Sequence, residues 1–190
     1  MRFAPDELGL DGFGSLVAPL FEDAPRFIER LATGQPYGSW DLLFDHATSV
    51  ALSMPRDEQI ELIDAHPRIG APSGSVSALS FVEQGYDQET ATAEAESERA
   101  RIGAELDRLN REYEERFGFR FVVFVAGRPR SAIIALMESA LVGDADEERD
   151  RALRDVVAIA RDRAIKTGLM AHDSDSKDEQ MQHRSPEVRT

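Results

Sequence analysis

The chain has 190 residues, with 36 acidic side chains against 22 basic ones and a formal net charge of −14. Such a negative surface repels a nucleic-acid duplex and an anionic bilayer, so we expect neither nucleic acid nor a membrane as a partner. Cysteine is absent, which excludes disulfides and thiol chemistry. Because the N-terminus also lacks the charged-then-apolar pattern of a secretory signal, the expected location is the cytoplasm.

Apolar residues recur at helical spacing in the N-terminal part of the chain, after a polar lead at residues 1–11. Ser39 has the side chain of an N-cap, and Pro55 suits the first turn of a helix that runs to His66. The predicted helices here lie around residues 13–21, 27–34, 40–51 and 55–66.

The second part of the chain is also predicted to be helical, with one exception. Helices are expected around residues 78–85, 89–117 and 131–141, with Ser131 as a cap, and from Asp144 or Asp146 onward. The exception is 119–126, which is dense in aromatic and β-branched residues and predicts a short buried extended segment. The expected fold is all-α, a single domain of seven to nine helices over 12–170, followed by a disordered tail at 171–190.

His66 is the first candidate for chemistry, because it lies where a helix must stop. Leu62 and Ile63 precede it by one turn, so the imidazole projects from the apolar face. Pro67 disfavours helical backbone in the residue before it. The partial negative charge of a helix C-terminus is expected to raise the pKa of the imidazole and to favour a general acid. The alternative is a core histidine that is hydrogen-bonded to a carbonyl.

Two further candidates carry charge on apolar elements. Ser80 and Glu83 match a capping box, with Ser80 as N-cap, and a carboxylate fixed in this way could also act in a site. Arg163 follows Ile159 by four positions and shares its inward face. An arginine on such a face either pairs with a buried carboxylate or binds an anion.

The extended segment is a candidate through its backbone. Residues 121–125 would have N–H and C=O groups that no helix satisfies, and a polar ligand could supply their partners. The alternative is a plain core segment that bonds to neighbouring loops. The four histidines show no zinc-ligand spacing, so no metal site is predicted.

Four motifs stand in an order that resembles the 2-oxo-4-hydroxy-4-carboxy-5-ureidoimidazoline (OHCU) decarboxylases. They are His66-Pro67-Arg68-Ile69-Gly70, Ser80-x-x-Glu83-Gln84, Leu109-Asn110-x-x-Tyr113 and Phe117-Gly118-Phe119-x-Phe121-Val122. The resemblance implies an all-helical homodimer without a cofactor. It further implies loss of CO2 from an anionic ureidoimidazoline to give (S)-allantoin, in the last step of urate oxidation.

The resemblance also implies roles for particular residues. His66 corresponds to the proton donor, and Glu83 would act with it. The implied substrate-binding residues are Pro67, Ser80, Phe81, Val82, Gln84, Phe121, Val122, Val123, Phe124, Val125 and Arg163. Two alternatives stay open, namely a lyase or hydrolase for another ureido compound, and a helical binding protein in which these residues only pack.

Overall fold

A computed structural model describes residues 4–71, 77–83 and 93–170, and these residues form helices without a strand. In order, the elements are the 3-10 helix η1 (Pro5–Leu8), α1 (Gly9–Val17), the 3-10 helix η2 (Ala18–Phe21), α2 (Pro25–Thr33), α3 (Trp40–Ser53), α4 (Arg56–Asp64), α5 (Ala78–Glu83), α6 (Ala93–Phe117), α7 (Arg130–Ala140) and α8 (Ala145–Lys166). The all-α prediction is therefore confirmed. The predicted tail at 171–190 lies outside the described residues.

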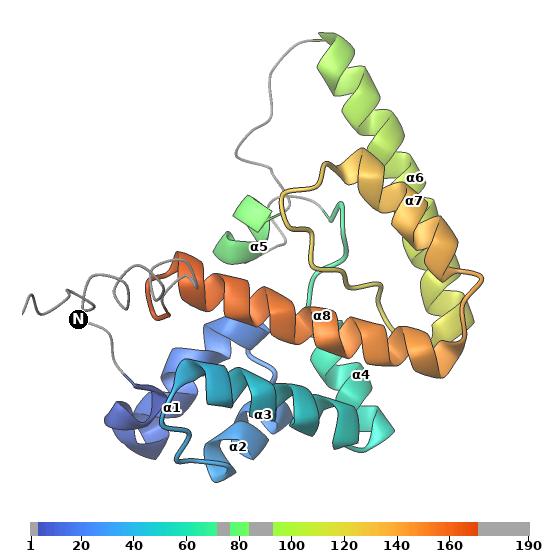
Figure 1. The fold of residues 1–190 in the computed structure, drawn as a ribbon. Helices are drawn as coiled ribbons and strands as arrows, with labels where there is room; N and C mark the ends of the chain where they lie inside the picture. Colours follow the sequence, from blue (N-terminus) through green and yellow to red (C-terminus); the bar gives the residue numbers. More distant parts are fainter. Residues whose placement is uncertain (1–3, 72–76, 84–92, 171–190) are drawn as a thin grey trace, which may run out of the picture.

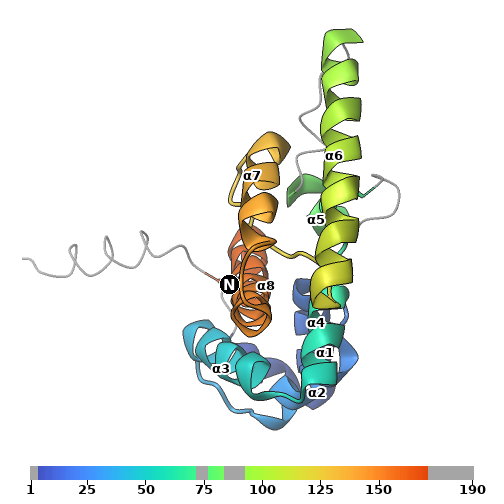
Figure 2. The same ribbon diagram turned by 90° about the vertical axis from the view of Figure 1, so that its right-hand side faces the viewer.

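Helix α8 is the central element of the fold. It packs against α3, α4 and η2 on one side, and α6 packs against α7. Figures 1 and 2 show α8 between the N-terminal helices and the α6–α7 pair. The packed stripe of α8 includes Ala152, Leu153, Val156, Val157 and Ala160, all buried. Because this stripe repeats every three or four residues, its side chains lie along one side of the helix.

The structure contains two of the predicted helix caps and corrects a third. Ser39 caps α3 by accepting a hydrogen bond from the Leu42 N–H, and Asp144 caps α8 through the Asp146 and Glu147 N–H groups. The prediction that Ser131 is a cap was wrong. Pro129 is the N-cap of α7 and the helix begins at Arg130, so Ser131 already lies inside the first turn.

The predicted extended segment is confirmed, since residues 119–125 run between α6 and α7 without helical structure. Phe119 and Phe121 are buried and meet the Tyr113 ring edge-on, with centroids 5.7 and 5.1 Å away. The Tyr113 hydroxyl donates to Glu148 at 3.1 Å. The motif tyrosine of α6 therefore anchors the segment and reaches α8.

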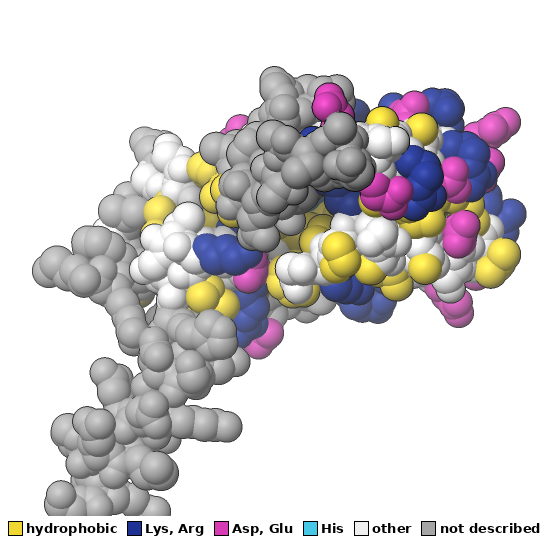
Figure 3. Space-filling model, turned by 90° about the horizontal axis from the view of Figure 1, so that it is seen from above, with side chains coloured by type: hydrophobic (Ala, Val, Ile, Leu, Met, Phe, Trp, Pro, Cys, Tyr) yellow, Lys and Arg dark blue, Asp and Glu magenta, His cyan; other side chains and the backbone are white. Residues whose placement is uncertain are grey.

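The surface mixes charges of both signs in spite of the net charge. Figure 3 shows basic and acidic side chains side by side on one face.

At the N-terminal end, the Asp6 carboxylate accepts hydrogen bonds from the Tyr37 and Gly38 N–H groups, so residues of the polar lead contact the helical domain. None of the described helices is long and apolar enough to span a membrane.

Candidate active site

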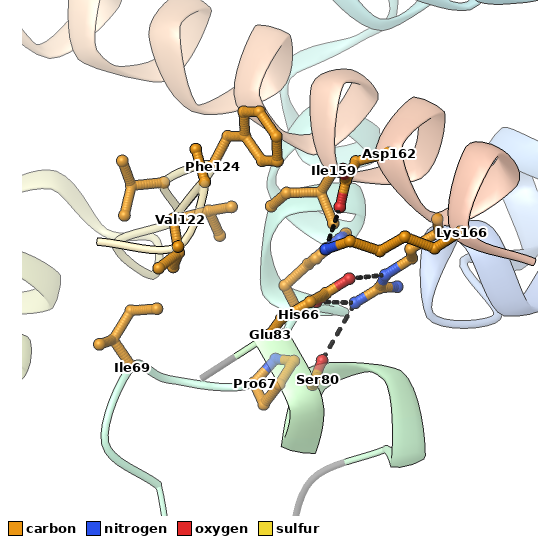
Figure 4. A pocket seen from close by; sticks show the side chains of 15 residues that line it. His66, Pro67, Ile69, Ser80, Glu83, Val122, Phe124, Ile159, Asp162 and Lys166 are labelled. Carbon is orange, nitrogen blue, oxygen red and sulfur yellow. Dashed lines mark hydrogen bonds and ion pairs between the residues drawn. The ribbon is translucent and has the colours of Figure 1, made fainter. Parts of the chain in front are cut away.

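One pocket brings together the candidates that the sequence singled out. It lies where the residues after α4, the short helix α5, the extended segment and the C-terminal part of α8 meet, and its cavity volume is about 50 Å³. Its wall includes His66, Glu83 and Arg163, which come from three different elements. Figure 4 shows His66 and Glu83 beside each other in this pocket. The prediction that these three side chains share one cavity is therefore confirmed. The other lining residues are Pro67, Ile69, Ser80, Val122, Val123, Phe124, Val125, Ala126, Gly127, Ile159, Asp162 and Lys166.

His66 lies just beyond the end of α4, with only 3% of its surface exposed. Its Nδ1 is 3.4 Å from the Leu62 carbonyl oxygen. A carbonyl can only accept, so Nδ1 carries the proton and the neutral ring leaves Nε2 as an acceptor. Among the described residues, Nε2 is buried without a hydrogen-bond partner. The carbonyl contact matches the core-histidine alternative, but the unpartnered Nε2 at the pocket wall does not.

The expected direction of the His66 pKa was wrong. Burial, together with the nearby Arg163 cation, lowers the pKa of His66 to about 4, although Glu22 and the Leu62 carbonyl act to raise it. The helix C-terminus was expected to raise the pKa, but desolvation of the charged ring outweighs it. The imidazole is therefore neutral near pH 7 in the ligand-free protein.

Arg163 pairs with two carboxylates and is 1% exposed. It binds Glu83 through Nε and Nη2, at 2.7 and 2.8 Å, and Glu22 through Nη2 at 2.7 Å. Its Nη1 donates to the Pro19 and Leu20 carbonyls. Of the two sequence alternatives, pairing with a buried carboxylate is thus the one that the ligand-free structure contains.

Glu22 is a site residue that sequence reasoning missed. It follows the buried pair Leu20–Phe21 in left-handed backbone, with φ of 50°. Its carboxylate also accepts from the Ser80 hydroxyl at 2.6 Å. Although burial acts to raise the pKa of Glu22, the Ser80 hydroxyl and the Arg163 cation lower it below its usual value. Glu22 is 141 positions from Arg163 in the chain, so helical spacing gave no signal for their contact.

The capping box predicted for α5 was wrong. The helix begins at Ala78, and the Ser77 hydroxyl accepts from the Ser80 N–H. Ser80 is therefore inside the first turn, where its own hydroxyl is free to contact Glu22 and Arg163. Glu83 pairs with Arg163 instead of reaching back to cap the helix. Both motif residues belong to the pocket.

The extended segment forms one wall, although not every predicted member faces the pocket. Val122 and Phe124 line it, whereas the buried Phe121 side chain lines a separate hollow and packs on Tyr113. The prediction for Phe121 concerned its backbone, and it stays a prediction. Val82 is 52% exposed and also lies off the pocket wall, because it occupies the outer face of α5. The predicted residues Phe81, for its side chain, and Gln84 lie outside the described set.

Two polar side chains hold the His66 loop in place. Arg120 donates to the carbonyl oxygens of Asp64 and His66, at 2.6 and 2.9 Å, and the Arg120 N–H donates to the Asp64 carboxylate at 2.8 Å. Asn110 of α6 donates to the Ile69 carbonyl at 3.0 Å. These bonds join the loop to the extended segment and to α6. Asn110 is one of the motif residues, whereas Arg120 occupies a motif position that the pattern left unspecified.

Comparison with known proteins relates this architecture to one family. The family model of OHCU decarboxylase matches residues 6–165. A relative named 2-oxo-4-hydroxy-4-carboxy-5-ureidoimidazoline decarboxylase, from Haloferax volcanii, is 31% identical over 155 residues, which cover 82% of this chain and 86% of the relative. A uric acid degradation bifunctional protein from Bacillus sp. (strain TB-90) is 26% identical, and the match covers 82% of this chain but 30% of that protein.

Solved structures share the fold. A crystal structure of OHCU decarboxylase in the presence of (S)-allantoin superposes with a TM-score of 0.58 at 21% identity, covering 76% of this chain and 91% of that one. A crystal structure of (S)-allantoin synthase gives the same TM-score at 16% identity, covering 86% of this chain and 54% of the other. With the family model matching most of its length, the chain belongs to the OHCU decarboxylase family.

Proposed function

We propose that the protein is a cofactor-free carboxy-lyase of urate degradation, which converts OHCU into (S)-allantoin and CO2. The observation that carries this proposal is the convergence of His66, Glu83 and Arg163 on one pocket beside the extended segment, in a chain of this family. Apolar walls and a few convergent polar groups are typical of a small-molecule site.

The chemistry requires that an electron pair be stabilised and that a carbon be protonated. The bond to the substrate carboxylate breaks, CO2 leaves, and the electron pair passes into the conjugated C–N system of the ring. A proton is then delivered to the ring carbon that becomes the stereocentre. The backbone N–H of Val123 is suited to stabilise the developing charge, because preorganised donors in a site that excludes water are effective there. The Phe124 N–H is not available for this, since it donates to Asp155.

His66 is our choice for the proton donor, with Nε2 as the atom that carries the proton. The ring is neutral in the ligand-free protein, so the proton must be acquired when the substrate binds. An anionic substrate next to Nε2 favours the imidazolium form and raises the pKa of His66. Each turnover then consumes one proton from solvent, transferred through Nε2 to carbon, and the ring returns to its neutral state.

The remaining residues orient the substrate in this proposal. Arg163 fixes both Glu83 and Ser80. In this proposal the Glu83 carboxylate accepts hydrogen bonds from the ureido group, and the Ser80 hydroxyl accepts or donates one. Pro67 borders the pocket beside His66. Arg163 supplies positive charge next to the substrate carboxylate, while its N–H groups hold the two protein carboxylates. Phe81, Val82 and Gln84 keep only the role that the family resemblance implies.

The test of the function is turnover of freshly generated OHCU, followed by circular dichroism. The enzyme should yield optically active (S)-allantoin faster than the spontaneous reaction. Other ureido compounds from purine breakdown, assayed in parallel, test the lyase or hydrolase alternative. Racemic product formed at the spontaneous rate would support the non-catalytic binding protein instead.

The role of His66 is tested by His66→Asn. We expect kcat to fall by about 10²–10⁴-fold, the range for loss of a general acid, while the fold is retained. His46→Asn is the matched control, since His46 lies on α3 and does not line the pocket. A His66→Asn variant as active as the parent would remove His66 from the mechanism.

Three further properties are proposed on the resemblance and the sequence. We infer a homodimer, a cytoplasmic location, and a catalytic domain that extends over residues 12–170. Sedimentation at several concentrations tests the dimer, and a truncation that begins at residue 12 tests whether the lead is dispensable for activity.

A further inference from the structure

Three carbonyl groups of the extended segment accept hydrogen bonds from arginines that do not line the pocket. The Val122 carbonyl accepts from Arg151 Nη1 at 2.9 Å. The carbonyls of Phe124 and Val125 both accept from the Arg128 guanidinium. Arg128 and Arg151 line a second hollow, together with Glu148 and Asp155, and neither arginine lines the pocket of His66.

A peptide group is planar and trans, so fixing its carbonyl also fixes the N–H of the next residue in the opposite direction. The Val122 carbonyl and the Val123 N–H belong to one such plane. With the carbonyl held by Arg151, the Val123 N–H must point away from Arg151. None of the described residues accepts a hydrogen bond from the Val123 N–H. Val123 is nevertheless only 8% exposed, and it is one of the residues that line the pocket.

Arg151 is itself held by three side chains. It pairs with Glu148 at 2.9 Å, through Nη2, and with Asp155 at 2.8 Å, through Nη1. Its guanidinium stacks 5.0 Å from the centroid of the Phe121 ring, and Glu148 is in turn fixed by the Tyr113 hydroxyl. A planar guanidinium with both carboxylates in place has little freedom, so it defines the orientation of the peptide plane closely.

We propose that Arg151 is a positioning residue, which sets the Val122–Val123 peptide plane so that the Val123 N–H donates to the bound substrate. Arg151 touches no substrate itself and acts through the backbone. This inference rests on the proposed decarboxylation only for its kinetic effect, because the contact between the N–H and a ligand can be observed without turnover.

Lysine is the sharpest substitution, because it keeps the positive charge but lacks the planar group. One ammonium can meet one or two of the partners Glu148, Asp155 and Val122, but not all three in the fixed arrangement of the arginine. We therefore expect Arg151→Lys to be partly active and Arg151→Met to lose more. Arg154→Met is the matched control, since Arg154 lies on the same helix, is 56% exposed, and pairs only loosely with Asp150 at 3.8 Å.

The first measurement compares kcat and KM for the parent and the three variants. For Arg151→Met we expect kcat to fall by about 10–100-fold, the range for misplacing one charge-stabilising donor, with a smaller change in KM. Arg154→Met should match the parent. An inactive parent would refute the proposed function, whereas an active parent with an equally active Arg151→Met variant would refute the role of Arg151.

The second measurement follows the Val123 amide by ¹⁵N-valine NMR during titration with (S)-allantoin. In the parent we expect the Val123 resonance to shift on binding, and in Arg151→Lys the shift should shrink or vanish. This readout separates positioning from general destabilisation, because it is taken on folded protein. A Val123 amide that does not respond to ligand in the parent would overturn the inference, whatever the kinetics.

Discussion

Arg151 and Arg163 of α8 have the same kinds of partner, but these partners come from different parts of the chain. Arg163 and Arg151 each pair with two carboxylates and each donate to backbone carbonyls outside α8. The carboxylates around Arg151 come from α8 itself, three and four positions away. Those around Arg163 come from Glu22 and Glu83, which lie 141 and 80 positions away.

The Arg151 cluster therefore supports the backbone of the extended segment, whereas the Arg163 cluster forms part of the pocket. A cluster built within one helix can form as soon as that helix forms, and here it clamps the back of the extended segment. A cluster built from three distant elements exists only in the folded protein, and it encloses a pocket. Arg163 is also the more deeply buried of the two, with 1% of its side chain exposed against 31% for Arg151.

The largest expected effect is that of Arg163→Met. Removal of the cation leaves Glu22 and Glu83 buried without their partner, which costs about 3–5 kcal/mol in the free energy of unfolding. Arg151→Met should cost less, because the Arg151 side chain is 31% exposed whereas that of Arg163 is 1% exposed. Urea denaturation of both variants measures the difference. Equal losses would contradict the distinction between the two clusters.

The next effect is the pH dependence of stability at His66. The folded-state pKa is lowered from 6.5 to about 4, so the stability that the neutral ring provides is present above pH 6.5 and is lost as the pH falls toward 4. The full difference is about 3 kcal/mol. We expect unfolding free energies measured between pH 7 and 4 to fall less steeply for His66→Asn than for the parent. Parallel curves would show that His66 does not titrate in this way.

Glu22→Gln should have a smaller effect with a distinct signature. The amide keeps an oxygen for Ser80 but removes the charge that opposes the lowering of the His66 pKa. We expect the alkaline limb of the pH profile of kcat, where His66 loses its proton in the complex, to move to lower pH, and stability to fall by about 1–3 kcal/mol. Asp23→Asn, at the exposed neighbouring position, is the control. An unmoved limb would rule out the coupling between Glu22 and His66.

The smallest effect is expected in a surface cluster on α6. Arg108 pairs with Glu105 and Glu112, three and four positions away, and is 44% exposed. Arg108→Met should change the unfolding free energy by less than about 1 kcal/mol, because solvent screens such pairs. Thermal denaturation checks this. A loss as large as that of Arg151→Met would mean that exposure does not separate these clusters.

The sequence by itself determined the helical class, most helix positions and the capping role of Ser39, because these depend on neighbours within a few residues. It left the start of the last helix at Asp144 or Asp146, and the structure has Asp144 as the cap. The sequence also placed His66 and Arg163 on buried faces, since the apolar spacing around each of them is local. The extended character of 119–125 followed from its aromatic and β-branched composition.

Only the tertiary structure decided what these residues contact. Glu22, in a left-handed turn after η2, contacts Arg163 and Ser80, and no local pattern predicted this contact. Ser80 was predicted both as a cap and as a substrate-binding residue, and the structure has it at the pocket but not as the cap. The His66 pKa moved opposite to the helix-end expectation, because the depth of burial depends on how α4, α8 and the extended segment pack together. Local pattern specifies which face of an element is buried, but the partners across that face are set by packing between elements far apart in the chain.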